Sequence, residues 1–317
     1  MTETKSIKRL HLGLTPWHYN SEIDADALCR QAELAETWGY DSFFLPESHF
    51  SGATSLPDPM LLLAAVAART TRLQLGTTSY LLPIRNALQA AQQVAALDRL
   101  CKGRLILGLG RGFQSAMLQA YGVDLKLKRQ QFETVLGGMR NAWAGNAIDA
   151  SAEPLRISPL PLQQPHPPLW VAAFGPKAIT QVGSMGLPYL ASPMETLDQL
   201  THNHQLHRDA ISKAGKKQPP EIIIMRTVYI SEDPDQCAQV RDKLASVGAG
   251  VHAKNAPNPV DDWCLIGSPE QVGVGIERYQ RHLGMTHLIA VRPRVPGISR
   301  DANCESMRLL SLMRKDG

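Results

Sequence analysis

A glycine-rich turn and two arginines are the clearest candidates for chemistry in this chain. Residues 108–112 read G-L-G-R-G after an apolar run, so the backbone can approach a ligand while Arg111 offers a guanidinium to a phosphate. The spacing differs from the G-x-G-x-x-G fingerprint of dinucleotide-binding proteins. Arg129 ends the cationic run 126–129 and would grip the same phosphate if it lay on the same face as Arg111. Taken alone, Arg111 also fits a glycine-rich turn with a solvated side chain, and Arg129 also fits a solvated helix start.

Other candidates lie at the ends of further apolar runs. His49 could serve as an acid or base near neutral pH, although a structural histidine fits the same position. Gly175 precedes a helical pattern and would offer backbone amides to an anion, or would simply cap the helix. No metal site is expected at His202, His204 and His207, because only the last two share a helix face and no carboxylate is suitably placed.

The elements that must position these residues alternate regularly along the chain. Eight short apolar runs have the length of strands, and each is followed by a segment with apolar residues at helical spacing. The predicted strands are 10–14, 42–45, 73–77, 104–109, 169–172, 189–191, 221–230 and 287–291. The predicted helices are 24–37, 60–69, 86–100, 129–143, 176–185, 195–214, 235–247, 269–283 and 302–314, with a Gly/Asn/Pro-rich loop over 248–259.

This alternation predicts an α/β protein with a parallel sheet, because each parallel crossover needs a helix. Eight repeats favour closure into a (β/α)8 TIM barrel, and a doubly wound sheet of similar size is the alternative. The Pro-rich stretch 154–168 cannot form a central helix or strand, so we expect an insertion between the fourth helix and the fifth strand. In a barrel, chemistry belongs at the carboxyl ends of the strands.

Composition excludes several classes of protein. A hydrophobic fraction of 44% is too high for disorder at a net charge of +4. The balance of 33 Lys and Arg against 29 Asp and Glu predicts neither a nucleic-acid nor a membrane surface. The sequence contains no uninterrupted apolar stretch of about 18 residues, so we expect no transmembrane helix. Although 317 residues allow two domains, α/β barrels of this size are single domains, so we expect one domain over residues 1–317.

The cysteines and the first residues bear on the compartment. Five cysteines lie far apart, with no C-x-x-C pair, which argues against a disulfide framework or a zinc site. Residues 1–9 are polar and lack the apolar core of a secretory signal peptide. We therefore expect a reducing, cytoplasmic location.

Several segments, in order, resemble the bacterial luciferase-like flavin monooxygenase family over nearly the whole chain. W-G-Y-D-S-F-F-L-P-E-S-H-F is similar to the family's G-F-D-x-x-W-x-x-E-H-H-F, and L-D-R-L-C-K-G-R-L-I-L-G-L-G-R-G is similar to its L-D-x-L-S-x-G-R-x-x-x-G-x-G-R-G. The matching segments are 38–50, 72–83, 95–112, 167–173, 266–272 and 292–298. One such motif is weak, whereas several in order at compatible spacing are specific.

The resemblance implies a (β/α)8 barrel that binds reduced FMN at its carboxyl face and activates dioxygen. By position, Arg111 and Arg129 match the family's phosphate-binding arginines. Phe174 and Gly175 match its second phosphate-binding loop, where backbone amides would replace the glutamate and serine of luciferases. Thr78-Ser79 falls where the family carries a non-proline cis peptide beneath the isoalloxazine ring, so we predict one here.

One departure from the family pattern concerns the catalytic group. The family's acidic residue is commonly followed by two histidines, of which luciferases use the first, but here the first is Ser48 and only His49 remains. This puts aldehyde oxidation with light emission in doubt. We assign Ser48 and His49 as candidate catalytic residues, with packing against the flavin pocket as the alternative for His49.

The prediction is therefore a two-component monooxygenase. Reduced, diffusible FMN would come from a separate NAD(P)H-flavin reductase, because the chain carries no nicotinamide fingerprint, and the resemblance implies a homodimer. Aromatic residues expected around the mouth, Trp17, Phe50, Phe113 and Phe174, suggest a small apolar organic substrate. The alternatives are a deazaflavin-dependent oxidoreductase that transfers hydride on the same fold, and a flavin-binding protein without turnover.

Overall fold

The computed structural model describes residues 9–20, 24–151, 153–247 and 259–313. The chain divides into two compact units. The N-terminal unit comprises residues 19–33 and 43–172, and the C-terminal unit comprises residues 1–18, 34–42 and 173–317. Helix α1 (Ala25–Thr37) and strand β2 (Ser42–Leu45) contribute residues to both. The predicted loop 248–259, apart from its last residue, and all but the last residue of the polar segment 1–9 lie outside the described residues.

The strands of the N-terminal unit run parallel. Strand β3 (Gln74–Thr77) pairs with β5 (Leu105–Gly110), and β5 pairs in turn with β6 (Leu169–Ala172). The two-residue strand β4 (Tyr80–Leu81) pairs with the carboxyl end of β5. Every side chain of β5 is buried, as expected for a parallel strand that is covered on both faces.

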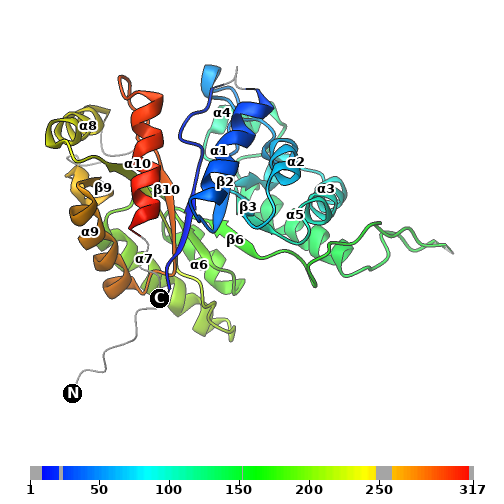
Figure 1. Ribbon diagram of the computed structural model, residues 1–317. Helices are drawn as coiled ribbons and strands as arrows, with labels where there is room; N and C mark the ends of the chain where they lie inside the picture. Colours follow the sequence, from blue (N-terminus) through cyan, green and yellow to red (C-terminus); the bar gives the residue numbers. More distant parts are fainter. Residues whose placement is uncertain (1–8, 21–23, 152, 248–258, 314–317) are drawn as a thin grey trace. The chain divides into compact units, whose positions relative to one another are not determined.

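Helices α2, α3 and α5 lie side by side in this unit (Figure 1). Asp58 begins α2 by accepting hydrogen bonds from the amides of Met60 and Leu61, and Asn86 begins α3 in the same way. Arg104 holds the end of α2 by donating to the carbonyl oxygens of Ala67 in its last turn, of its C-cap Thr70 and of Leu73 in the next loop. The helical segments are η1 (Gly52–Thr54), α2 (Pro59–Arg69), η2 (Leu82–Ile84), α3 (Ala87–Leu100), α4 (Ser115–Ala120) and α5 (Lys128–Trp143).

A close approach inside the sheet depends on Gly76 of β3. A Cβ atom at this position would lie 2.4 Å from Cε1 of Phe44 and 2.9 Å from the carbonyl oxygen of Ile106. Phe44 is completely buried and stacks on Trp170, with ring centroids 5.6 Å apart, so it has little room to move. The glycine therefore allows β2 and β3 to pack at this distance.

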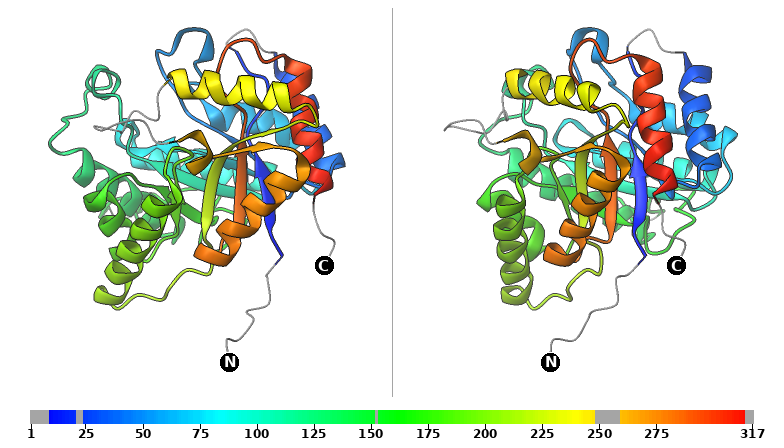
Figure 2. Two further views of the ribbon diagram at one scale, coloured as in Figure 1. Left: turned by 90° about the vertical axis from the view of Figure 1, so that its left-hand side faces the viewer. Right: turned by 60° about the vertical axis from the view of Figure 1, so that its left-hand side comes forward.

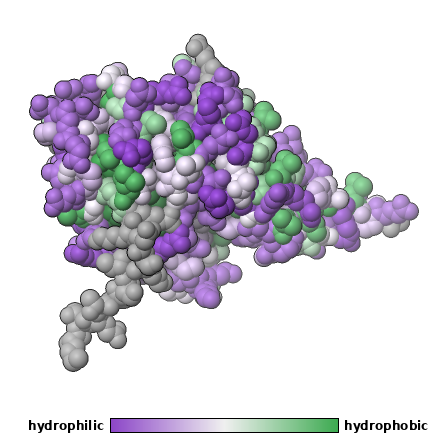
Figure 3. Space-filling view, in the orientation of Figure 1, coloured by the Kyte–Doolittle hydropathy of each residue, from purple (hydrophilic) through white to green (hydrophobic). Residues whose placement is uncertain are grey.

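Between α5 and β6, the described residues form neither helix nor strand. This Pro-rich segment is tied to the unit through the buried Asp98, whose carboxylate accepts hydrogen bonds from the Gln163 amide (2.8 Å) and side chain (2.7 Å). The Arg99 guanidinium also donates to the Leu160 carbonyl oxygen. Figure 3 shows the segment with hydrophobic colouring among hydrophilic, and Leu155 and Leu162 are exposed.

The strands of the C-terminal unit are also parallel. Strand β1 (His11–Leu14) pairs with β10 (His287–Val291), and the two run side by side in both views of Figure 2. Strand β8 (Ile223–Ile230) pairs with β10 and with β7 (Tyr189–Ala191) through its first half, and with β9 (Cys264–Gly267) through its second.

The helices of the C-terminal unit begin at well-formed caps. Helices α7 and α9 each open with a capping box, formed by Thr196 with Gln199 and by Ser268 with Gln271. Helix α9 ends at Gly284, whose φ of 72° is the left-handed conformation that favours glycine. The helical segments are α6 (Pro176–Ser184), α7 (Leu197–Lys213), α8 (Pro234–Val247), η3 (Val260–Asp262), α9 (Pro269–Leu283) and α10 (Arg300–Leu312).

A charged cluster is buried between β8 and the helices that cover it. Arg226 has no exposed surface, lies 4.6 Å over the Tyr279 ring and donates to the Met225 carbonyl oxygen. The buried Glu195 accepts hydrogen bonds from the Tyr189 hydroxyl and the Asn203 side chain. Burial raises the pKa of Glu195, and the hydrogen bonds from Tyr189 and Asn203 and the charge of Arg226 oppose that shift.

All eight predicted strands are present, with their ends shifted by up to two residues. Strand β9 and the short elements β4 and α4 were not predicted, since their two to six residues carry too little periodicity to be recognised. Helix α10 begins two residues earlier than predicted and its predicted last residue lies outside the described part. Within the described residues, no helix is both long and apolar enough to cross a membrane.

Candidate active site

The carboxylate of Glu47 is completely buried at the end of β2. Its Oε2 accepts a hydrogen bond from the Leu81 amide at 2.9 Å. Its Oε1 accepts one from Nη2 of Arg85 at 2.5 Å and lies 2.7 Å from Nε2 of His49. Arg85, whose guanidinium lies 4.1 Å over the Tyr80 ring, supplies the positive charge that a buried carboxylate requires.

His49, one of the two predicted catalytic residues, is buried with both ring nitrogens engaged. Nε2 faces Glu47, and Nδ1 lies 2.9 Å from the hydroxyl oxygen of Tyr121. The rings of His49 and Tyr121 meet edge to face, with centroids 5.1 Å apart. Phe50 follows in the left-handed conformation, with φ of 54°, and its ring is 72% exposed.

Ser48, the other predicted catalytic residue, uses its hydroxyl within its own loop. The hydroxyl donates to the Thr54 carbonyl oxygen at 3.1 Å and accepts from the Leu56 amide at 3.0 Å. Ser48 and Leu56 also form an isolated antiparallel bridge. These bonds close the loop that carries His49, so the serine shapes the site even where it touches no reactant.

The peptide bond between Thr78 and Ser79 is cis, as predicted. The Thr78 amide donates to the Leu45 carbonyl oxygen at 2.8 Å, which links the ends of β2 and β3, and its buried hydroxyl oxygen has no hydrogen-bond partner. A Cβ atom on Gly110 would lie 2.0 Å from Oγ of Ser79. Glycine at the end of β5 therefore leaves the space that Ser79 occupies.

Arg111 and Arg129 come together in the N-terminal unit, and Lys128 joins them. Burial lowers the pKa of Arg111, and the charge of Arg129 lowers it further, with Glu133 acting in the opposite direction. Burial and the charge of Arg111 lower the pKa of Lys128, whose Nζ donates to the Gly112 carbonyl oxygen at 3.0 Å. Arg111 and Lys128 are thus partly buried cations under each other's influence, and the exposed Arg129 adds its charge to that of Arg111.

Phe174 and Gly175 belong to the C-terminal unit, whereas the other predicted site residues belong to the N-terminal one. Gly175 is the N-cap of α6, with φ of 80° and no side chain to cap the helix. A Cβ atom on Gly175 would meet nothing within 4 Å. Phe174 is 43% exposed.

The predicted aromatic lining is wrong for one residue. Trp17 is 2% exposed and stacks on Trp38 of the same unit, so it belongs to the core. An aromatic residue after a strand looks the same in a sequence whether its ring turns inward or outward. Phe50 and Phe113 are more than 70% exposed, in keeping with a role in contacting a substrate.

Four residues of this arrangement escaped the sequence analysis as members of a site. Glu47 was noted only as the family's acidic position, and Lys128 only as part of a cationic run. Arg85 follows an apolar stretch without a recognisable motif. Tyr121 follows α4, which was not predicted, so nothing in the sequence connected it with His49.

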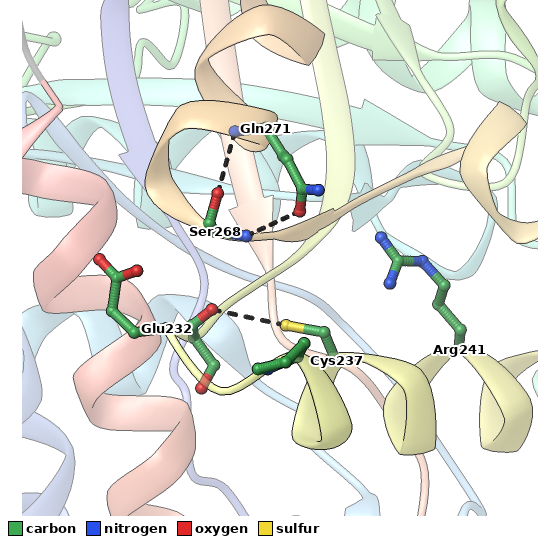
Figure 4. Close-up of a pocket in the computed structure, with 7 residues that line it drawn as sticks. Glu232, Cys237, Arg241, Ser268 and Gln271 are labelled. Atoms are coloured by element: carbon green, nitrogen blue, oxygen red, sulfur yellow. Dashed lines mark hydrogen bonds between the residues drawn. The ribbon is translucent and has the colours of Figure 1, made fainter.

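A separate pocket in the C-terminal unit contains none of the predicted residues (Figure 4). Its volume is roughly 240 Å³, and it is lined by Ser231, Glu232, Pro234, Cys237, Arg241, Ser268 and Gln271. Ser268 and Gln271 are engaged in the capping box of α9, and Arg241 is paired with Asp261. Its polar groups thus serve the local structure.

The histidines of α7 contribute to packing. His204 and His207 are buried, and Nε2 of His207 lies 2.8 Å from the Leu187 carbonyl oxygen. Among the residues that the structure describes, no three His, Cys, Asp or Glu side chains are grouped so as to hold a metal ion.

Comparison with known proteins identifies relatives of one kind. A family model described as luciferase-like monooxygenase matches residues 12–287. The oxygenase component of the flavin-dependent trigonelline monooxygenase of Acinetobacter baylyi is 28% identical over 68% of this chain. That match covers 61% of the relative, so the chain spans about three fifths of its length. Limonene 1,2-monooxygenase of Rhodococcus erythropolis is 25% identical over 86% of this chain and 76% of its own.

Solved structures agree over almost the full length. The monooxygenase RslO1 of Streptomyces bottropensis has a TM-score of 0.79 and 26% identity, covering 96% of this chain and 98% of its own. The oxygenating constituent of 3,6-diketocamphane monooxygenase of Pseudomonas putida, in complex with FMN, has a TM-score of 0.75 at 18% identity over 96% and 97%. An F420-dependent secondary alcohol dehydrogenase has the same TM-score at 16% identity over 97% and 100%. The fold is the TIM barrel, as predicted.

Proposed function

The chain belongs to the luciferase-like monooxygenase family, and we propose that it is the oxygenase of a two-component flavin-dependent system. In this proposal a separate NAD(P)H-flavin reductase supplies reduced FMN, which the chain uses with dioxygen to oxygenate a small apolar organic substrate. The relative from Acinetobacter baylyi is named as an oxygenase component, which supports this division of labour. A homodimer in the cytoplasm belongs to the same proposal.

The observation that carries the proposal is the meeting of Arg111, Lys128 and Arg129 after β5. Their mutual repulsion is relieved by a dianionic group, and a guanidinium presents a planar donor pair that suits phosphate oxygens. Arg111 lies 5.9 Å over the Phe132 ring, which restricts its direction. These residues therefore fit the phosphate of FMN.

The residues around Thr78 and Ser79 fit the flavin ring. The Thr78 hydroxyl is a buried polar atom in need of a partner, and Gly110 keeps the neighbouring space free of a side chain. Bound reduced FMN supplies the electrons with which one oxygen atom of dioxygen enters the substrate and the other becomes water. In this proposal the protein orients the flavin ring, Phe50 and Phe113 contact the substrate, and His49 lies near the flavin ring.

The phosphate assignment is tested by fluorimetric titration with FMN and with riboflavin, which lacks the phosphate. Arg111→Ala/Arg129→Ala should weaken FMN binding at least about tenfold for each arginine, because a hydrogen bond to a charged group contributes about 1.5–3 kcal/mol. Riboflavin binding should be unchanged. Arg30→Ala/Arg69→Ala is the matched control, since these arginines of the same unit pair with Asp26 and Glu33 instead. Undiminished FMN binding by the first variant would refute the assignment.

The deazaflavin alternative rests on the fold that this chain shares with an F420-dependent secondary alcohol dehydrogenase. Ser48, which stands where luciferases carry their catalytic histidine, favours the other alternative, a flavin-binding protein without turnover. A deazaflavin would use the same cationic group through its own phosphate, so binding alone does not separate the two cofactors. Oxygen consumption does: rapid uptake with reduced FMN supports the oxygenase, and turnover only with the deazaflavin, without oxygen uptake, supports hydride transfer. Stoichiometric FMN binding without turnover of either kind would indicate a flavin-binding protein.

A further inference from the structure

A chain of hydrogen bonds runs from the buried core of the N-terminal unit to an exposed phenol. It begins at Arg85, passes through the carboxylate of Glu47 to Nε2 of His49, and continues from Nδ1 to the Tyr121 hydroxyl. The three contacts measure 2.5, 2.7 and 2.9 Å. Because Glu47 only accepts, the hydrogen on Nε2 belongs to the imidazole. When the imidazole is protonated on both nitrogens, Nδ1 donates to the Tyr121 oxygen, and the tyrosine's own hydrogen is free to point away from His49.

The exposures along this chain differ sharply. The side chain of Glu47 has no exposed surface and that of His49 has 5%, whereas Tyr121 is 45% exposed. With both nitrogens engaged and its ring enclosed, His49 has no free atom to offer a reactant. Tyr121 has one, since a hydroxyl oxygen bonded to Nδ1 still carries a further donor or acceptor direction.

The chain of hydrogen bonds also begins close to the residues where the flavin ring is proposed to lie. The Leu81 amide, which donates to Glu47, comes two residues after Ser79. At the other end, the ring of Tyr121 lies 6.0 Å from that of Phe50, one of the exposed aromatic side chains assigned to the substrate. Tyr121 is therefore linked to the proposed ring site through His49 and Glu47, and it lies beside Phe50 of the proposed substrate surface.

Building on the proposed function, we propose that Tyr121 is the catalytic acid of this site and that His49, Glu47 and Arg85 are positioning residues that act through it. The oxygen atom that does not enter the substrate leaves as water and needs a proton. The step starts from His49 protonated on both nitrogens and donating from Nδ1 to the Tyr121 oxygen. The Tyr121 O–H bond breaks, its proton forms the new O–H bond on the departing oxygen, and the Nδ1 proton of His49 moves to the tyrosine oxygen. This leaves a neutral tyrosine and a neutral imidazole with its hydrogen on Nε2, and solvent then returns one proton to His49 through the exposed Tyr121 hydroxyl.

Tyr121, His49 and Glu47 resemble a catalytic triad in which the tyrosine hydroxyl replaces the serine hydroxyl. Glu47 fixes the imidazole through Nε2 and stabilises its charged form, while Arg85 keeps the carboxylate in place. The other ionisable groups near Arg85 are Tyr80 and Asp58. This explains how the site works without a histidine at position 48, because the acid is delivered from α4 instead.

The first test uses reduced FMN and dioxygen as probes, without a substrate, because oxidation of bound reduced FMN to release hydrogen peroxide takes up one proton. In stopped-flow measurements, Tyr121→Phe should slow this oxidation about a hundredfold or more, the usual contribution of a positioned acid, with FMN affinity unchanged. The wild-type rate should depend on pH, and the variant rate should not. Tyr19→Phe is the matched control, since it removes a hydroxyl bonded only to the Ser55 carbonyl oxygen.

The second test needs no cofactor. In the ¹⁵N NMR spectrum of the histidine-labelled apoprotein, His49 should show a protonated Nε2, and Tyr121→Phe should shift only the Nδ1 resonance. Wild-type oxidation kinetics in the variant, or an unmoved Nδ1 resonance, would overturn the proposal while leaving the proposed function intact. Failure of the wild type to bind FMN would instead overturn the proposed function, and the NMR result alone would then decide whether the relay exists.

Discussion

Replacing His204 with glutamine should make the protein less sensitive to mild acid. His204 lies on α7 with 4% of its surface exposed, 5.1 Å from the Tyr189 ring, and its Nε2 has no hydrogen-bond partner. Burial lowers the pKa of His204 to about 3, with His207, Arg208 and Arg226 adding to the effect through their positive charges. The folded chain therefore holds this imidazole neutral.

The sign and size of the effect follow from linkage. A histidine with a depressed pKa contributes stability above its unfolded pKa of about 6.5, and this stability is lost as the pH falls towards the folded value of about 3. Each pH unit in that window costs about 1.4 kcal/mol, so lowering the pH from about 6.5 to about 5 removes about 2 kcal/mol through this residue. Burial and His11 likewise lower the pKa of His287 to about 4, which adds to the acid sensitivity of the wild type.

The assay is urea unfolding followed by circular dichroism at about pH 7 and about pH 5. The wild type should lose about 2 kcal/mol more than His204→Gln between the two conditions. His202→Gln, at an exposed position of the same helix, controls for the loss of a histidine from α7. Equal losses in the wild type and His204→Gln would refute the reasoning, because His204 would then bind its proton equally in both states.

Three further changes test the packing. Gly76→Ala should destabilise the fold by about 1–3 kcal/mol, measured as free energy of unfolding, because its Cβ atom would collide with the buried Phe44. Asp58→Ala should cost about 1 kcal/mol through loss of the α2 cap, whereas Asp58→Asn should retain most of it. Glu195→Gln should cost about 1–3 kcal/mol, because it weakens the buried hydrogen bonds that the carboxylate accepts from Tyr189 and Asn203. An unchanged free energy of unfolding would count against this role.

The parts of the fold that the sequence predicted are those with long-range regularity. Eight apolar runs alternating with helices specify a parallel arrangement, since burial on both faces leaves little choice of residue. Strand β9 was missed because Cys264–Gly267 is as short as a buried loop segment and precedes α9 directly. The extent of each helix was recovered best where a strong cap such as Asn86 begins it.

The site was predicted as far as local sequence reaches. Arg111 and Arg129 could be paired because each lies in a recognisable segment, and the structure does bring them together. Tyr121 is different, since its position beside His49 depends on the turn that α4 makes after residue 114. Trp17 shows the same limit, because only tertiary packing decides that its ring faces Trp38.

The hydrogen bonds from Gln163 to Asp98 fix the base of the segment between α5 and β6. The tip of the segment, residues 148–155, lies beyond these bonds. The tip is self-contained: the Ile148 amide donates to the Leu155 carbonyl oxygen, and Asp149 accepts hydrogen bonds from Ser151 and the Leu155 amide. Because Gln163 and Asp98 hold the base of the segment, we expect a change of length in the tip to leave the entry into β6 in place.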